Sequence, residues 1–246
     1  MSKSKSSVEG SFKYLIQERI KNFWGYGNLN SDIWFVGMEE GYNENNEVLF
    51  ERFKATAHGE VFDVYEDLKV DPGHVFWFKE GAPTQPTYRP LIFILLFLKT
   101  NKIPTLEEIR QFQIHNFGRK NSNHAILELM PLPSKSTRQQ DWHYGNLGIL
   151  ELSSRRKYLE IYKEKRCLKL KELIDQYKPK IVIFYSLGYI QDWQRVTGLN
   201  FVEISKKIFI TKNHNTLYVA VFHPIYFGLT KKYWEEVARV IANNLS

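Results

Sequence analysis

Residues 32–41 read DIWFVGMEEG, a short apolar run that ends in a glycine and two carboxylates. The apolar part is almost continuous rather than alternating, which is typical of a strand buried on both faces of a sheet. Three further runs have this character: HAILELM at residues 124–130, PKIVIFY at 179–185 and TLYVAVF at 216–222. The sequence therefore predicts four buried strands.

Helical patterns separate and flank these strands. They cover residues 8–24, 88–99, 105–117, 151–177 and 230–245. Thr105 and Glu108 have the spacing of a capping box, which supports the third of these helices. Strands separated by helices need crossover connections, which give a parallel sheet covered on both faces. We therefore expect an α/β fold, a three-layer α/β/α sandwich around a mainly parallel sheet of about four strands.

The length and composition predict a single domain. The chain has 246 residues, of which 43% are apolar, enough to bury one sizeable core. Residues 1–7 are expected to form a disordered tip, and residues 43–90 an insertion or a pocket-lining segment. The longest strongly apolar run, residues 91–98, is too short to span a membrane. We expect a monomeric cytoplasmic protein.

The cysteine and histidine content argues against bound metals. Cys167 is the only cysteine, which excludes an intramolecular disulfide, a cysteine-rich zinc site and a four-cysteine iron–sulfur cluster. The seven histidines show neither H-x-x-x-H nor H-x-H spacing. We expect no metal and no cofactor.

The charge distribution favours an anionic partner. The net charge is +7, and residues 151–246 carry 17 basic against nine acidic side chains, whereas residues 1–150 carry 17 against 18. A nucleic-acid backbone is the commonest ligand for such a basic field, and the 15% aromatic content favours base stacking. A basic surface that only keeps the protein soluble is the alternative interpretation.

Polar residues follow the predicted strands and are the candidates for chemistry. In a parallel sheet, ligands bind outside the carboxyl ends of the strands. Glu39, Glu128 and His223 come from three of these ends, so we expect them to converge. A carboxylate opposite a histidine could supply a general base and a group that stabilises an anion. Taken singly, Glu39 and Glu40 are better explained as parts of a solvated turn, and His223 as a hydrogen-bonded loop histidine.

These strand ends together resemble the uracil-DNA glycosylase superfamily across most of the span from residue 32 to residue 245. Residues 37–41 (GMEEG) resemble the first motif, closest to the G-M-N-P-G form of the single-strand-selective monofunctional enzymes. Residues 128–132 (ELMPL) are similar to the strand that carries the base-reading Asn, with Glu128 in the place of Asn. Residues 179–188 are similar to the third strand, and His223-Pro224 to the H-P-S-P motif, with Ile225-Tyr226 replacing Ser-Pro.

The resemblance implies roles for these residues. Glu39 would hold or activate the water that attacks the sugar C1′, His223 would stabilise the departing base as an anion, and Glu128 would read the base. Further substrate contacts are expected from Met38, Tyr42 and, as the ring that stacks on the base, Phe53.

The same resemblance assigns the loop after His223 to DNA binding. An apolar wedge that enters the duplex and nearby cations that hold phosphates are expected from Ile225, Tyr226, Phe227, Lys231, Lys232, Lys135 and Arg138. An ordinary loop that packs its aromatic rings into the core is the alternative.

The sequence thus predicts a monofunctional DNA glycosylase that removes an altered base from single- or double-stranded DNA and leaves an abasic site. Glu128 in the place of Asn favours a modified cytosine, in repair or in defence against phage DNA. A non-catalytic DNA-binding module on the same scaffold and a uracil-DNA glycosylase are alternatives. A third is a metal-dependent nuclease that uses Glu39, Glu40 and Asp63. Glu40 is also the alternative to Glu39 as the catalytic carboxylate.

Overall fold

The computed structural model describes residues 2–42 and 45–245, with backbone only for residues 2–9. It contains the four predicted strands as β2 (Ile33–Gly41), β4 (His124–Ser134), β5 (Ile181–Tyr185) and β8 (Leu217–Val221). They lie side by side in the order β4-β2-β5-β8, and each neighbouring pair is parallel. The predicted parallel core of the sheet is therefore confirmed.

The complete sheet is larger than predicted, and it is mixed. Eight strands run in the order β3-β1-β4-β2-β5-β8-β7-β6. The additional strands are β1 (Gly25–Gly27), β3 (Val61–Phe62), β6 (Val202–Ser205) and β7 (Ile208–Lys212). β1 is antiparallel to β4, and β7 is antiparallel to both β6 and β8. The expectation of a mainly parallel sheet of about four strands was wrong in both respects.

β1, β3 and β6 lack the apolar run that marks a buried strand, and β7 has only the short run IFI. β1 depends on close backbone contact, because a Cβ on Gly25, whose φ is +145°, would lie only 2.0 Å from the Ile126 carbonyl oxygen. Only glycine permits this approach. β6 lies at the edge of the sheet, where Val202 and Ile204 are exposed. Its sequence therefore lacks the continuous apolar pattern of a strand that is buried on both faces.

The five predicted helices are present. They are α1 (Ser2–Asn22), α5 (Tyr88–Thr100), α6 (Leu106–His115), α7 (Arg155–Tyr177) and α9 (Lys231–Asn244). The Thr105–Glu108 capping box is formed. α1 already begins at Ser2, within the segment where a disordered tip was expected.

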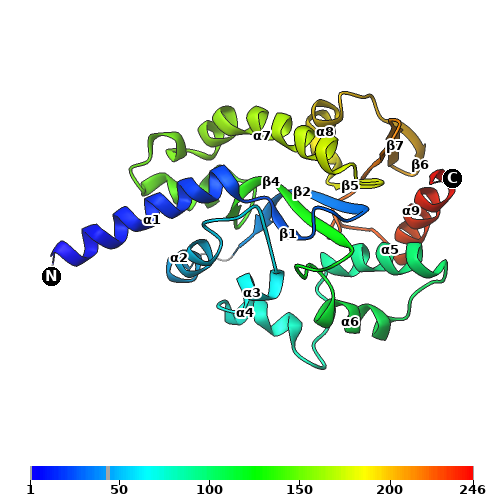
Figure 1. Cartoon of the computed structure of the whole chain (residues 1–246), viewed down its shortest axis with the longest axis horizontal. Helices are drawn as coiled ribbons and strands as arrows, with labels where there is room; N and C mark the ends of the chain where they lie inside the picture. Colours follow the sequence, from blue (N-terminus) through cyan, green and yellow to red (C-terminus); the bar gives the residue numbers. More distant parts are fainter. Residues whose placement is uncertain (1, 43–44, 246) are drawn as a thin grey trace.

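Helices cover both faces of the sheet (Figure 1). On one face, Trp34 and Val36 of β2 share a core with α1, α7 and α8 (Ile190–Thr197). On the other face, Phe35 and Ile183 pack against α5, α6 and α9. The result is a three-layer α/β arrangement whose parallel strands are buried on both sides.

The segment predicted as an insertion or a pocket-lining segment packs against the rest of the fold, apart from residues 43–44, which lie outside the described residues. It contains α2 (Asn46–Ala55), β3, α3 (Val64–Leu68) and α4 (Pro72–Val75). Its side chains form a third apolar cluster with Phe23 and Tyr26. Through β3 it also extends the central sheet.

Across residues 2–42 and 45–245, no helix is both long enough and apolar enough to cross a membrane.

Candidate active site

The carboxyl ends of the parallel strands bring Glu39, Glu128 and His223 to one edge of the sheet. In the register of β2 and β4, Gly37 lies opposite Glu128 and Glu39 lies opposite Met130. β5 ends at Tyr185, whose ring centroid is 5.8 Å from that of His223, just after β8. Tyr185 also contacts Glu128, so it connects the carboxyl group on β4 with the histidine after β8.

Glu128 is a buried carboxyl group with one hydrogen bond. The Tyr185 hydroxyl donates to Glu128 Oε1 at 2.9 Å, whereas Oε2 is buried and has no partner within the described part of the chain. Burial, reinforced by the charges of Glu40 and Glu39, raises the pKa of Glu128 to about 8 despite the Tyr185 hydrogen bond. Glu128 is therefore mainly protonated at neutral pH.

Glu39 is held by an arginine that sequence reasoning missed. Arg155 Nη2 lies 2.8 Å and 2.9 Å from the two Glu39 carboxylate oxygens. Burial raises the pKa of Glu39, and the Arg155 guanidinium opposes this shift. Arg155 is the first residue of α7, directly after the capping residue Ser154, and it belongs to no recognisable motif.

His223 has a neutral imidazole with one defined donor. Burial lowers the pKa of His223 below its usual value near 6.5. The Ile225 amide donates to His223 Nδ1 at 3.4 Å, a long hydrogen bond that favours the tautomer with its proton on Nε2. The Nε2–H group is thus available as a hydrogen-bond donor.

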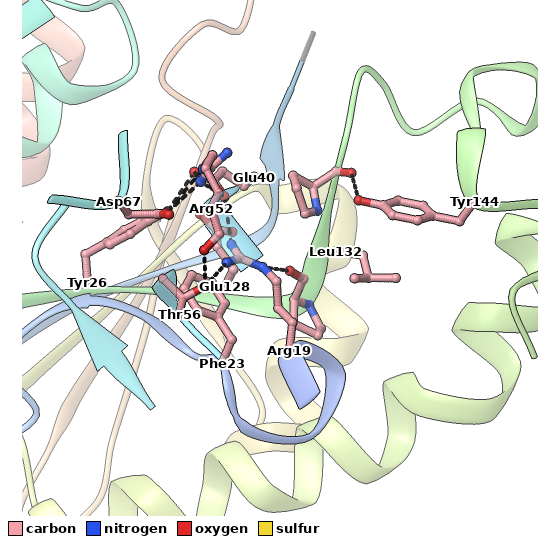
Figure 2. Close-up of polar contacts among 12 residues, drawn as sticks. Arg19, Phe23, Tyr26, Glu40, Arg52, Thr56, Asp67, Glu128, Leu132 and Tyr144 are labelled. Atoms are coloured by element: carbon pink, nitrogen blue, oxygen red, sulfur yellow. Dashed lines mark hydrogen bonds and ion pairs between the residues drawn. The ribbon is translucent and has the colours of Figure 1, made fainter. Parts of the chain in front are cut away.

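Glu40 belongs to a buried ion-pair network rather than to the open edge of the sheet. Its carboxylate accepts hydrogen bonds from Arg52 Nη2 at 2.8 Å and 3.0 Å, from Arg19 Nη2 at 3.2 Å and from the Tyr26 hydroxyl at 2.9 Å. Arg52 also pairs with Asp67 at 2.7 Å (Figure 2). These contacts connect Glu40 with α1 and α2, whereas Glu39 pairs with Arg155 on α7.

This network predicts a large effect on stability. We expect Arg52→Met to lower the free energy of unfolding by about 3–5 kcal/mol, because it leaves the carboxylates of Glu40 and Asp67 without their shared cation. Urea denaturation followed by circular dichroism measures the loss. Arg156→Met, which removes an exposed arginine, is the control and should leave the unfolding midpoint unchanged. A loss below about 1 kcal/mol for Arg52→Met would show that the network is not stabilising.

Three predicted substrate contacts are core residues. Met38 and Phe53 are buried in the core on the α1 and α7 face, where Phe53 stacks on Phe12 at 6.1 Å. Tyr42 is buried, and its hydroxyl donates to the Asn45 carbonyl oxygen. The stacking role expected of Phe53 is not supported, because its ring is fully buried on the inner face of α2 and offers no free face to a base.

The predicted DNA-binding residues are at the surface. The exposed fractions of Ile225, Tyr226 and Phe227 are 63%, 56% and 97%. Lys231 and Lys232 are exposed in the first turn of α9. Lys135 and Arg138 are exposed in the loop after β4, where Arg138 pairs with Asp141 at 3.0 Å. The interpretation that the loop after His223 buries its aromatic rings in the core therefore does not hold for Tyr226 and Phe227.

The carboxylates expected for a metal-dependent nuclease, Glu39, Glu40 and Asp63, do not form a cluster. Asp63 caps α3 and pairs with Arg119 at 3.1 Å, while Glu40 is engaged by Arg19 and Arg52. Among the described residues, no three histidine, cysteine or carboxylate side chains are grouped as metal ligands would be. The geometry thus gives the nuclease interpretation no support.

No protein-family model matches the chain, and no curated protein matches it. The functional assignment therefore depends on the geometry of this site and on the motif resemblance.

Proposed function

We propose that the chain is a monofunctional DNA glycosylase, which hydrolyses the N-glycosidic bond of a flipped base and leaves an abasic site. The observation that carries the proposal is the edge of the sheet where Glu39, protonated Glu128 and neutral His223 lie beside an exposed apolar loop. The motif resemblance to the uracil-DNA glycosylase superfamily supports the same reaction. The basic excess of residues 151–246 supports DNA as the partner.

The charges at the site suit this reaction. Cleavage of an N-glycosidic bond develops positive charge on the sugar and negative charge on the base. Glu39 acts on the sugar side, where its carboxylate stabilises the sugar cation and orients the attacking water. Arg155, which bonds both carboxylate oxygens, holds Glu39 in place. His223 acts on the base side, where Nε2–H donates to the departing anion.

The loop after His223 suits the extrusion of a base. A base inside a duplex is out of reach, so the enzyme flips it and fills the gap with an apolar wedge. Phe227 is almost fully exposed, and a cluster of exposed apolar side chains marks a binding surface. Lys231 and Lys232 follow directly and hold the adjacent phosphates.

The protonated carboxyl group of Glu128 can complement cytosine. Cytosine presents N3 as an acceptor and its N4 amine as a donor, and a protonated Glu complements both groups. Uracil presents a donor at N3 and an acceptor at O4, the pattern that an Asn amide matches. A 5-substituent marks the substrate as altered, since excision of unmodified cytosine would destroy the host genome. The setting is repair or defence against phage DNA.

Glu128→Asn tests the choice of base. We expect this variant to lose release of the modified cytosine by at least about 100-fold and to gain release of uracil, because the amide donates to O4 and accepts from N3–H. Base release from matched oligonucleotides measures both activities. Glu107→Asn, which alters an exposed glutamate on α6, is the control and should match the parent. A parent protein that prefers uracil to every modified cytosine would contradict the proposed base and favour a uracil-DNA glycosylase.

A further inference from the structure

A cavity of about 460 Å³ lies between α1 and α7, which pack on the same face of the sheet (Figure 1). It has the size of a pocket for a small ligand. Its lining consists mainly of charged and polar side chains from the two helices: Gln17, Lys21, Tyr162, Lys165, Arg166 and Lys169. Four of these side chains are cations, and none of the described residues that line the cavity is acidic.

The lysines gather at this cavity without matching negative charges. Lys165 and Lys169 are four residues apart on α7, a spacing at which like charges destabilise a helix. Lys21 lines the same cavity from α1. Lys169 pairs with the exposed Glu172 at 3.2 Å. Neither Lys21 nor Lys165 forms an ion pair with another described residue. An anion in the cavity would offset the repulsion between these charges.

Arg166 adds a buried cation to the lining of the cavity, with only 5% of its surface exposed. Its Nε donates to the Leu129 carbonyl oxygen at 2.8 Å. Its Nη2 donates to the carbonyl oxygens of Phe23 and Glu128 at 2.9 Å and 3.1 Å. Nη1 is buried and has no acceptor among the described residues. The guanidinium thus contacts backbone carbonyl groups but no carboxylate, so the protein supplies no counter-charge for it.

Arg52 shows how the protein neutralises another buried arginine. The carboxylates of Glu40 and Asp67 lie 2.8 Å and 2.7 Å from Arg52 Nη2, and their charges raise the pKa of Arg52 although burial opposes this. Burial instead lowers the pKa of Arg166 to about 9, with no carboxylate to oppose the shift. A bound anion would stabilise the charged form of Arg166 as the two carboxylates stabilise that of Arg52.

We propose that the cavity between α1 and α7 is a phosphate-binding site, in which Lys21, Lys165 and Lys169 contact phosphate oxygens and Arg166 supplies a buried positive charge. Phosphate suits a cavity with several cations, because its oxygens accept several charge-assisted hydrogen bonds. The phosphate belongs to a nucleic-acid backbone or to a free nucleotide. The half-buried ring of Tyr162 offers a surface on which an attached base can stack.

This site differs from the proposed base-excision site, because Glu39, Glu128 and His223 do not line the cavity. The inference therefore goes beyond the proposed function.

Titration with inorganic pyrophosphate tests the site without nucleic acid. Replacement of Arg166 would leave buried carbonyl groups without their donor, so the variant is Lys21→Gln/Lys165→Gln, which changes two exposed lysines. We expect it to weaken pyrophosphate binding by at least about tenfold in isothermal titration calorimetry. The control is Lys171→Gln/Lys180→Gln, which removes the same charge from exposed lysines outside the cavity and should bind like the parent.

Binding of a short single-stranded oligonucleotide tests the nucleic-acid backbone as the source of the phosphate. Fluorescence anisotropy at several salt concentrations gives the affinity and the slope of its logarithm against the logarithm of salt concentration. If the backbone is the source, we expect Lys21→Gln/Lys165→Gln to weaken binding by at least about tenfold and to reduce the slope by about 1–2, and the control to match the parent.

The two assays together decide the inference and identify the source of the phosphate. A loss of oligonucleotide binding, with or without a loss of pyrophosphate binding, assigns the cavity to a nucleic-acid backbone. A loss confined to pyrophosphate assigns it to a free nucleotide. Parent-like binding of both probes by Lys21→Gln/Lys165→Gln, an equal loss in the control, or binding of neither probe by the parent would overturn the inference. Neither assay depends on base release, so a failure of the proposed glycosylase activity does not affect this result.

Discussion

The Glu39→Gln variant is expected to lose base release by at least about three orders of magnitude and to retain DNA binding. In the proposed mechanism, the carboxylate acts on the sugar cation and its water in the transition state, and a neutral amide cannot replace its charge. Arg155 can still donate to the side-chain amide oxygen of this variant, so the local packing is kept. Single-turnover base release and fluorescence anisotropy with the same oligonucleotide measure the two properties.

Glu107→Gln is the control, because it neutralises an exposed carboxylate on α6, outside the proposed site. It should release the base at the parent rate. If Glu39→Gln keeps a rate within about tenfold of the parent, equivalent to roughly 1.4 kcal/mol, Glu39 is not the catalytic group. Glu40 would then become the candidate for the catalytic carboxylate, despite its ion pairs with Arg19 and Arg52.

His223→Ala is expected to lower the rate by about two to three orders of magnitude, the usual effect of removing one preorganised donor to a developing anion. The neutral imidazole donates from Nε2, so the loss should be largest for bases that are poor leaving groups. A series of 5-substituted bases with increasing leaving ability measures this dependence.

His214→Ala is the matched control, because His214 is an exposed histidine in the turn before β8. It should have the parent rate on every base of the series. An equal loss across all bases in His223→Ala would contradict the donor role. It would indicate that His223 instead stabilises the structure of its loop.

The sequence predicted the parallel core because burial on both faces leaves a clear pattern. The runs that became β2, β4, β5 and β8 are almost continuously apolar, and the intervening helices imply parallel pairing. The edge strands have no such pattern. β1 is three residues long and depends on glycine, and β3 has only two residues. Their pairing is decided by tertiary contact with β4 and with each other.

The positions of the site residues were predictable in part. The rule that ligands bind at the carboxyl ends of parallel strands pointed to Glu39, Glu128 and His223. Tyr185 ends a predicted strand beside them, so the same rule could have indicated it. Arg155 could not be foreseen, because its contact with Glu39 joins residues 116 positions apart.

Phe53 illustrates where the motif resemblance fails. The resemblance placed the stacking ring at Phe53, which lies on α2, but the inner face of this helix packs into the core. Leu49, Arg52 and Phe53 are buried together on that face. Sequence spacing locates the helix, whereas the face that a residue occupies depends on how the helix packs.

Mass spectrometry of the bases released from a panel of genomic and phage DNAs tests the proposed glycosylase activity most directly. The same DNAs are treated with alkali to reveal abasic sites. We predict release of a free 5-substituted cytosine base together with alkali-labile sites from DNA that contains it, and neither product with Glu39→Gln. Binding of these DNAs without any released base or abasic site would contradict the proposed activity and would identify the chain as a non-catalytic DNA-binding module.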